Sequence, residues 1–178
     1  MKTLIVYFSF TGNNELLANA MGRDLEADVL QITEPKKRGM FRIMTDMLFN
    51  RFPKIDTLKI SWKKYDRIVL MAPIWNYLIA HPMKSFIKNN KESLKSYSFI
   101  TLCSGRDTQK EKIAKQLKKL VRYEPQAIIE FEILKLPTYK EQKDSMYKVT
   151  QDDLNTFRQE EVYQKLLKSH SAKEELLQ

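Results

Sequence analysis

The sequence predicts an α/β fold in which a five-stranded parallel sheet lies between two layers of helices. Three short runs are continuously apolar and rich in β-branched and aromatic residues, which is typical of strands covered on both faces. These runs are residues 3–8, 67–72 and 99–103. Segments with helical spacing separate them, and strands that alternate with helices at this pitch form parallel β-α-β units.

The remaining elements follow in order along the chain. Weaker strand patterns at 28–33 and 127–134 bring the strands to five. An apolar stripe predicts a helix after the first strand, and another predicts a helix after the run at 99–103, where Thr108 and Glu111 are expected to form a capping box. Pro82 suits the first turn of a further helix, and a terminal helix is expected from about residue 152 to residue 167.

Length and composition predict one domain. The 178 residues are 43% hydrophobic and 30% charged, so a single core is expected over residues 1–170, followed by a polar tail at 171–178. The longest apolar run, 68–75, is far shorter than the ~20 residues of a membrane span. The N-terminus lacks a signal-peptide cleavage pattern, so we expect a cytoplasmic protein with no transmembrane segment. One cysteine, Cys103, excludes an intrachain disulfide and a cysteine-based metal site, and no metal is expected.

Positive charge is concentrated in one segment. The chain carries a net charge of +9, and residues 34–67 hold ten basic against four acidic residues, which is +6 of that total. The same region, 34–66, is too long for a simple connection and contains a helical pattern with one apolar side. That side is formed by Met40, Phe41, Met44, Met47, Leu48 and Phe52. We expect it to pack against the sheet or against a sister subunit.

Three loops are expected to meet at one edge of the sheet. Ligands of open parallel sheets bind beyond the carboxyl ends of the strands, which nominates residues 9–14, 73–81 and 104–108. In the first loop Ser9 and Thr11 offer hydroxyl groups, and Gly12 lets a ligand approach the backbone where a helix begins. Unpaired amides at a helix start can bind phosphate without the help of basic side chains. The chain has no basic residue between Lys2 and Arg23.

The three loops resemble those of flavodoxin and its FMN-binding relatives. The phosphate loop of that family follows the pattern [ST]-x-T-G-x-[TN], and the chain reads SFTGNN at 9–14. The chain's segments APIWNY at 72–77 and CSGRDT at 103–108 resemble the second and third loops of that family. In the first loop, Asn14 stands where Thr is usual. The resemblance implies these cofactor-binding residues: Ser9, Phe10, Thr11, Gly12, Asn13, Asn14, Pro73, Ile74, Trp75, Asn76, Tyr77, Ser104, Gly105, Arg106 and Asp107.

The resemblance also implies a fold and a role for each loop. It implies a three-layer flavodoxin-like fold with strand order 2-1-3-4-5 and FMN as cofactor. Trp75 and Tyr77 would shield one face of the flavin ring, and the backbone from Ser104 to Asp107 would meet its polar edge. The chemistry would take place on FMN, so no catalytic side chain is nominated. Arg106 near the pyrimidine edge would favour the anionic reduced ring and two-electron chemistry.

Each signal also has a purely structural explanation. The TGN sequence at 11–13 could be a turn into a helix, and Trp75 could be a packing residue at a strand end. Arg106 and Asp107 could form a solvated pair at a helix start. His81 and Cys103 are interpreted as structural residues. A Cys-based phosphatase is excluded because the spacing between Cys103 and Arg106 is too short for a phosphate cradle.

Three functions remain open on the sequence alone. The first is an FMN-dependent oxidoreductase that uses NAD(P)H to reduce a quinone or a similar acceptor. The second is a one-electron carrier whose basic segment docks an acidic partner. The third is a basic binding protein for nucleic acid or an anionic surface. The first reading expects a small-molecule or protein redox partner, no nucleic acid, and a monomer or homodimer.

Overall fold

Five parallel strands form one sheet in the order β2-β1-β3-β6-β7. The computed structural model describes residues 2–36, 39–105, 108–142 and 147–175. The two remaining strands, β4 and β5, form a separate hairpin, and without them the order is the predicted 2-1-3-4-5. The strands are β1 (Thr3–Tyr7), β2 (Asp28–Gln31), β3 (Arg67–Met71), β4 (Ile74–Trp75), β5 (Leu78–Ile79), β6 (Tyr97–Cys103) and β7 (Ile128–Glu132).

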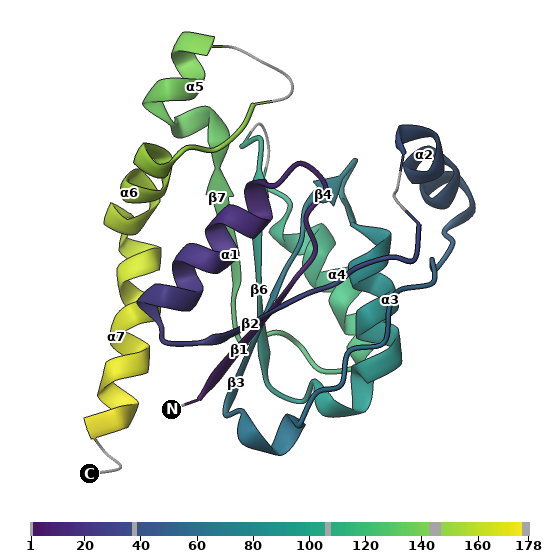
Figure 1. Ribbon diagram of the computed structural model, residues 1–178, viewed down its shortest axis with the longest axis horizontal. Coiled ribbons are helices and arrows are strands. Elements are labelled where there is room, and N and C mark those ends of the chain that lie inside the picture. The colour runs from purple at the N-terminus through teal and green to yellow at the C-terminus, as the bar shows by residue number, and fades with distance from the viewer. Residues whose placement is uncertain (1, 37–38, 106–107, 143–146, 176–178) are drawn as a thin grey trace.

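Helices cover both faces of this sheet. Figure 1 shows α1, α6 and α7 on one side of the strands and α3 and α4 on the other. Two hydrophobic clusters fill the spaces between the layers, one on each face. The helices are α1 (Asn13–Asp24), α2 (Met40–Phe49), α3 (His81–Asn90), α4 (Lys110–Val121), α5 (Pro137–Gln142), α6 (Gln151–Gln159) and α7 (Glu161–Glu175); short 3-10 turns occupy Trp62–Lys64, Lys91–Ser93 and Ile133–Lys135.

The continuous apolar runs are the central strands, as predicted. Every residue of β1, β3 and β6 is buried, whereas the edge strand β7 alternates buried and half-buried residues. Strands covered on both faces need no polar side, which is why their sequences do not alternate. All five strands run parallel, so their carboxyl ends and the loops after them lie at the same edge.

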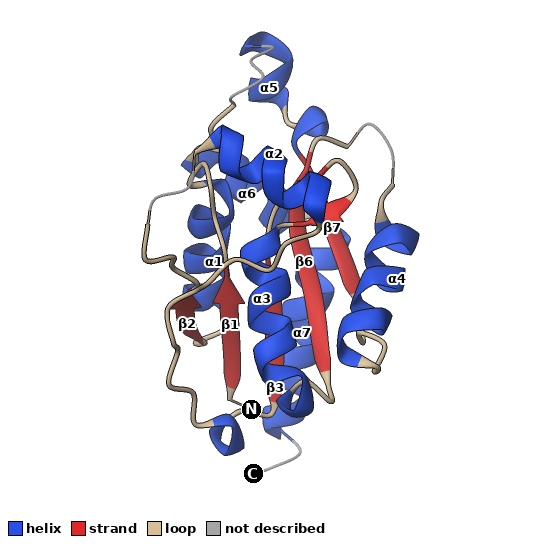
Figure 2. Ribbon diagram, turned by 90° about the vertical axis from the view of Figure 1, so that its right-hand side faces the viewer, coloured by secondary structure: helices blue, strands red, loops and turns tan. Residues whose placement is uncertain are grey.

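The apolar side of α2 does not pack on the sheet, which was the first of the two expected partners. Figure 2 shows α2 lying across the carboxyl-edge end of α3, away from the strands. The extended segment 51–61 lies against that face of the fold instead, and Ile55, Leu58 and Ile60 pack partly into the core. The hydroxyl of Ser85 on α3 holds this segment in place, because it donates a hydrogen bond to the Pro53 carbonyl at 2.8 Å. Within α2, only Ile43 and Asp46 are buried.

Two predicted helix ends were also wrong. The capping box of Thr108 and Glu111 does not form, because α4 begins at Lys110. A carboxylate from the neighbouring strand takes its place: Glu130 accepts hydrogen bonds from the Thr108 hydroxyl at 3.0 Å and the Gln109 amide at 2.8 Å. At the other end of the chain, the expected single helix is two helices, and α7 continues to Glu175.

The break between α6 and α7 lets two aromatic side chains reach the same partner. Phe157 and Tyr163 both pack on Phe131 of β7, with ring centroids 5.1 and 5.9 Å away. Residues six apart in an unbroken helix point to different sides. Asp24 on α1 secures the arrangement, because it accepts hydrogen bonds from the Arg158 guanidinium at 2.7 Å and the Tyr163 hydroxyl at 2.6 Å.

Candidate functional site

The first loop presents a helix N-terminus at the carboxyl edge of the sheet. Gly12 is the N-cap of α1 and has φ +93, a left-handed conformation that favours glycine. A Cβ placed on Gly12 would have no atom within 4 Å, so the space beside its backbone is open. No side chain caps α1, and the amides of its first turn have no partners within the helix.

Two polar side chains of this loop differ in their hydrogen bonding. The Ser9 hydroxyl accepts a hydrogen bond from the Gly12 amide at 3.1 Å, so this amide is not free, although the sequence suggested it was. Asn14 is 3% exposed, and its side-chain oxygen has no hydrogen-bond partner in the described part of the chain. A buried acceptor without a partner carries a desolvation cost, which a hydrogen-bond donor would relieve. Thr11 is exposed at the rim of the loop.

Asn13 has a structural role that the sequence did not reveal. Its side-chain nitrogen donates to the Tyr147 carbonyl at 2.9 Å, and its side-chain oxygen accepts from the Val149 amide at 3.1 Å. The pair of bonds ties the start of α1 to a segment 134 residues away. The side chain is therefore committed to the fold, and only the backbone amide of Asn13 remains for a ligand.

One carboxylate stands in the first turn of α1. Glu15 bonds to the Tyr7 hydroxyl, and burial together with this negative neighbour raises the pKa of Tyr7 to about 12. Tyr7 therefore stays protonated at neutral pH and can keep donating to Glu15. Within residues 3–22 the loop and helix carry no basic side chain, so an anion here would be held by neutral donors and the helix dipole.

The second loop is a tight hairpin. β4 and β5 pair through Trp75 and Leu78, and the two turn residues, Asn76 and Tyr77, have φ +45 and +64. Two left-handed residues form a turn that matches the twist of the strands. Gln116 on α4 holds the turn, because it donates to the Tyr77 carbonyl at 2.8 Å and accepts from the Ile79 amide at 3.2 Å.

Trp75 lies against the first loop. Its ring meets Phe8 and Phe10 edge to face, each with centroids 6.0 Å apart and planes at 86°. This aromatic group joins the first and second loops, and the contacts are those of the packing residue that was the alternative explanation for Trp75. Tyr77 is exposed, and the Lys112 ammonium sits 3.3 Å from its ring centroid. Pro73, just before the hairpin, and Ile74, the first residue of β4, are half-buried.

The third loop turns sharply after β6. Gly105 has φ +85, and a Cβ there would lie 2.8 Å from the Glu132 Cβ, so glycine is required. Ser104 is exposed, and its carbonyl accepts from the Leu134 amide at 3.0 Å. Arg106 and Asp107, which the sequence placed in the site, lie outside the described residues.

Two other candidates are structural, as interpreted from the sequence. Burial and the nearby Glu130 raise the pKa of the Cys103 thiol to about 11, so it is protonated and unreactive at neutral pH. His81 is fully buried at the start of α3. Across residues 2–36, 39–105, 108–142 and 147–175, no group of three His, Cys, Asp or Glu could hold a metal ion. None of the helices in those ranges is long and apolar enough to cross a membrane.

Comparison with known proteins gives one family and several structures. A family model described as "Flavodoxin domain" matches residues 50–149, a stretch that contains the second and third loops but not the first. No curated protein sequence matches the chain significantly.

Solved structures that resemble the chain include flavoproteins and flavodoxins. A flavoprotein in complex with FMN from Lactobacillus acidophilus NCFM superposes with a TM-score of 0.63 at 17% identity, covering 72% of this chain and 92% of that one. The apo-form of the flavoprotein from that organism gives a TM-score of 0.60 at 16% identity, covering 74% and 93%. Oxidised Flavodoxin 1 from Bacillus cereus gives 0.50 at 13% identity, covering 96% and 95%. These likenesses show the same fold.

Proposed function

The chain belongs to the flavodoxin domain family, and we therefore propose that it binds FMN at the carboxyl edge of its sheet and works as an FMN-dependent oxidoreductase. The observation that carries this proposal is the first loop. Gly12 leaves open space beside an uncapped helix N-terminus, and Asn14 in the first turn of that helix has a buried amide oxygen with no partner in the described part of the chain.

The phosphate of FMN fits this loop chemically. The amides of Asn13 and Asn14 would donate to it, and the Ser9 and Thr11 hydroxyls are available at the same turn. If Asn14 is turned so that its amide nitrogen faces the ligand, it adds another donor, since the two orientations of an amide are nearly isosteric. The helix dipole favours the negative charge, so the loop needs no lysine or arginine.

The second and third loops support binding of the flavin ring. Trp75 is fixed by its edge contacts with Phe8 and Phe10, so a planar ligand would meet a rigid aromatic wall. The Gln116 hydrogen bonds hold the hairpin that carries it. The tight turn at Gly105 brings backbone groups to the edge where a polar ring would lie. When bound, FMN would supply the electron-transfer and hydride-transfer chemistry.

We further propose NAD(P)H as reductant and a quinone or similar small molecule as acceptor. The net charge of +9 supports this reading, because it attracts the anionic nucleotide and differs from the acidic character of carrier flavodoxins. The protein would position both substrates beside Trp75 and exclude water from the ring. The competing proposal, a one-electron carrier for an acidic protein partner, rests on the same positive charge.

The test begins with the purified protein and added FMN. We expect saturable binding with a shifted visible absorption spectrum, and oxidation of NADPH or NADH when a water-soluble quinone is supplied. Replacing Trp75 by Phe should alter both the bound spectrum and the affinity. The matched change Trp62→Phe, at a half-buried tryptophan that packs on Phe86, should alter neither.

Each part of the proposal can fail separately. Absence of FMN binding contradicts the cofactor assignment. FMN binding without turnover of either nucleotide contradicts the oxidoreductase assignment and favours the carrier. Reduction of the bound flavin by an acidic redox protein, but not by NAD(P)H, would establish the second function instead.

A further inference from the structure

The large exposed hydrophobic side chains are concentrated on α2. Phe41 and Leu48 are 79% and 77% exposed, and their neighbours on the same helix are also open to solvent. Ile43 and Asp46 face the protein, so the outward side of the helix is almost entirely apolar. The outward side and the chain just after it hold Met40, Phe41, Met44, Leu48, Phe49 and Phe52, which we call the α2 face. An exposed apolar surface made of six large side chains marks an interaction site.

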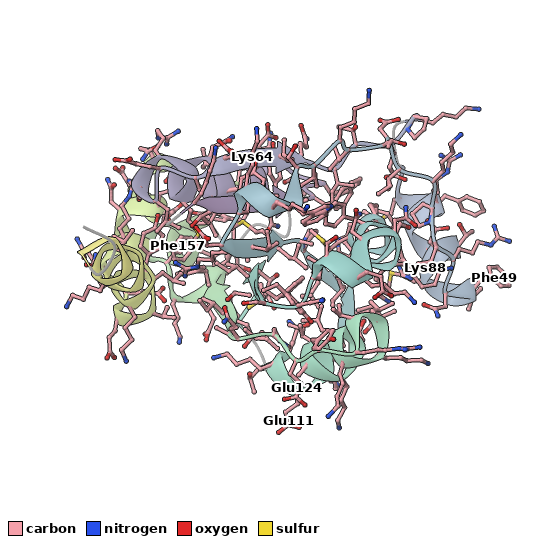
Figure 3. All side chains as sticks on the ribbon, turned by 90° about the horizontal axis from the view of Figure 1, so that it is seen from below. Phe49, Lys64, Lys88, Glu111, Glu124 and Phe157 are labelled. Carbon is pink, nitrogen blue, oxygen red and sulfur yellow. The ribbon has the colours of Figure 1, made fainter. Side chains whose placement is uncertain are left out.

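Positive charges touch this face directly. The Arg51 guanidinium lies 5.0 Å from the centroid of the Phe49 ring, and the Lys88 ammonium lies 4.6 Å from that of Phe52. Figure 3 shows Phe49 projecting at the outer edge of the molecule, with Lys88 on the same side. Asp46 is the one acidic residue of α2, and it is buried. The exposed surface of the helix therefore combines aromatic and aliphatic groups with cations.

A basic groove of about 530 Å³ runs between α2, α3 and α4 beside the α2 face. Its apolar wall is formed by Met47 of α2, Phe52 just after it, Leu78 of the β4–β5 hairpin and Leu120 of α4, and none of the described residues lining it is acidic. Four lysines line it: Lys84, Lys88, Lys91 and Lys119. Lys84 is only 5% exposed, and burying a cation without an opposite charge is costly. An anionic group in the groove would offset that cost.

We propose that α2 is an interfacial helix that docks the protein on an anionic phospholipid bilayer, with its apolar face among the acyl chains and the flanking lysines and arginines on the headgroup phosphates. A short helix with Phe and Leu on one side and cations beside them is suited to this position. The helix stands on a convex corner of the fold, so it can enter a bilayer without the rest of the chain moving (Figure 1).

Charge argues against a second copy of this chain as the occupant. A two-fold symmetric dimer would place the same patch on both sides of the interface. Both sides of the interface would then carry Arg42, Arg51 and Lys88 without an exposed acidic residue of α2 between them, so like charges would be brought together. Phosphodiester headgroups supply the opposite charge, and the acyl chains cover the apolar side chains.

The experiment is co-sedimentation of the full chain with vesicles of phosphatidylcholine alone and of phosphatidylcholine with 30% phosphatidylglycerol, in about 0.1 M salt. We expect binding to the anionic vesicles only, and weaker binding at higher salt. Phe41→Ser combined with Leu48→Ser should reduce the partition coefficient at least about tenfold. Both side chains are exposed, so the variant should fold, which circular dichroism checks. Tyr123→Ser, at an exposed tyrosine between α4 and β7, is the matched control and should bind as the wild type does.

A second pair of variants separates local charge from net charge. Arg51→Glu with Lys88→Glu should abolish binding to anionic vesicles. Arg23→Glu with Lys165→Glu makes the same change in net charge on the opposite helical layer and should retain most of the binding.

Several results would overturn this inference. They are absence of binding to anionic vesicles, equal binding by the serine variant, equal loss with both charge pairs, and tighter binding to duplex DNA at the same salt. A solution dimer that the serine variant converts to a monomer would assign the α2 face to a second copy. FMN plays no part in these measurements, so their outcome is independent of the proposed cofactor.

Discussion

Replacing Gly12 by alanine tests whether this loop binds phosphate, and the loss of folding stability that the change causes can be calculated in advance. Gly12 has φ +93, and holding an L-residue in the left-handed region costs about 1–2 kcal/mol. A Cβ there meets no atom within 4 Å, so no packing penalty is added. For a chain of 178 residues we expect the midpoint of thermal unfolding to fall by about 2–8 °C.

The same change should also weaken FMN binding. The new methyl group would occupy the open space where the phosphate is proposed to approach, and losing one hydrogen bond to a charged group costs about 1.5–3 kcal/mol. The dissociation constant of FMN should therefore rise about 10-fold to 100-fold. Calorimetric unfolding of the protein without FMN measures the first effect, and a fluorescence titration at 25 °C measures the second.

Gly39→Ala is the matched control for this prediction. Gly39 also begins a helix and has open space around its Cβ position, but its φ of −97 suits any residue. We expect a change in unfolding free energy within about 1 kcal/mol and no change in FMN affinity. If Gly12→Ala loses stability as calculated yet binds FMN as tightly as the wild type, Gly12 is only a turn residue and the phosphate reasoning is refuted.

Three further predictions concern the surroundings of the site. Asn13→Ala should cost about 1–3 kcal/mol in denaturant unfolding, because it leaves the Tyr147 carbonyl and Val149 amide buried without partners; an unchanged midpoint would contradict this. Gly105→Ala should cost about 3 kcal/mol, more than Gly12→Ala, because the Cβ would add a collision with Glu132 to the strain of φ +85. For Asp24, burial opposes ionisation, but hydrogen bonds from Arg158 and Tyr163 outweigh it and hold the pKa of its carboxyl below 3.8. A carboxyl whose pKa is lower in the folded than in the unfolded protein stabilises the fold at pH values above the unfolded pKa. This stabilisation is lost as the pH falls through the folded pKa. The difference in unfolding free energy between wild type and Asp24→Asn should therefore be constant above about pH 5 and shrink below 3.8; a difference that grows toward low pH would refute the assignment.

The sheet could be predicted because its signal is local. Strands β1, β3 and β6 are buried on both faces, and this makes their residues apolar without alternation. The three loops follow from that assignment, since parallel strands place their carboxyl ends at one edge. The left-handed Gly12 at the start of α1 confirms the turn that the TGN sequence indicated.

The errors arose where long-range contacts decide the structure. The apolar pattern of α2 correctly predicted a one-sided helix, but periodicity does not say whether that side faces the core or solvent. Glu130, on a strand 21 to 22 residues further along the chain, provides the hydrogen bonds in place of the expected capping box. Asn13 bonds to backbone more than 130 residues distant, for which no local pattern exists. One missed feature did have a signal: Thr150 and Asp153 form a capping box at α6, with the spacing typical of that motif.

The central claim is that the start of α1 holds the phosphate of FMN. Parallel titrations with FMN and with riboflavin, which lacks the phosphate, test it most directly. At least two charge-assisted hydrogen bonds of about 1.5–3 kcal/mol each should make FMN bind about 100-fold or more tightly than riboflavin. Equal affinity for the two flavins, or no affinity for either, would contradict the account.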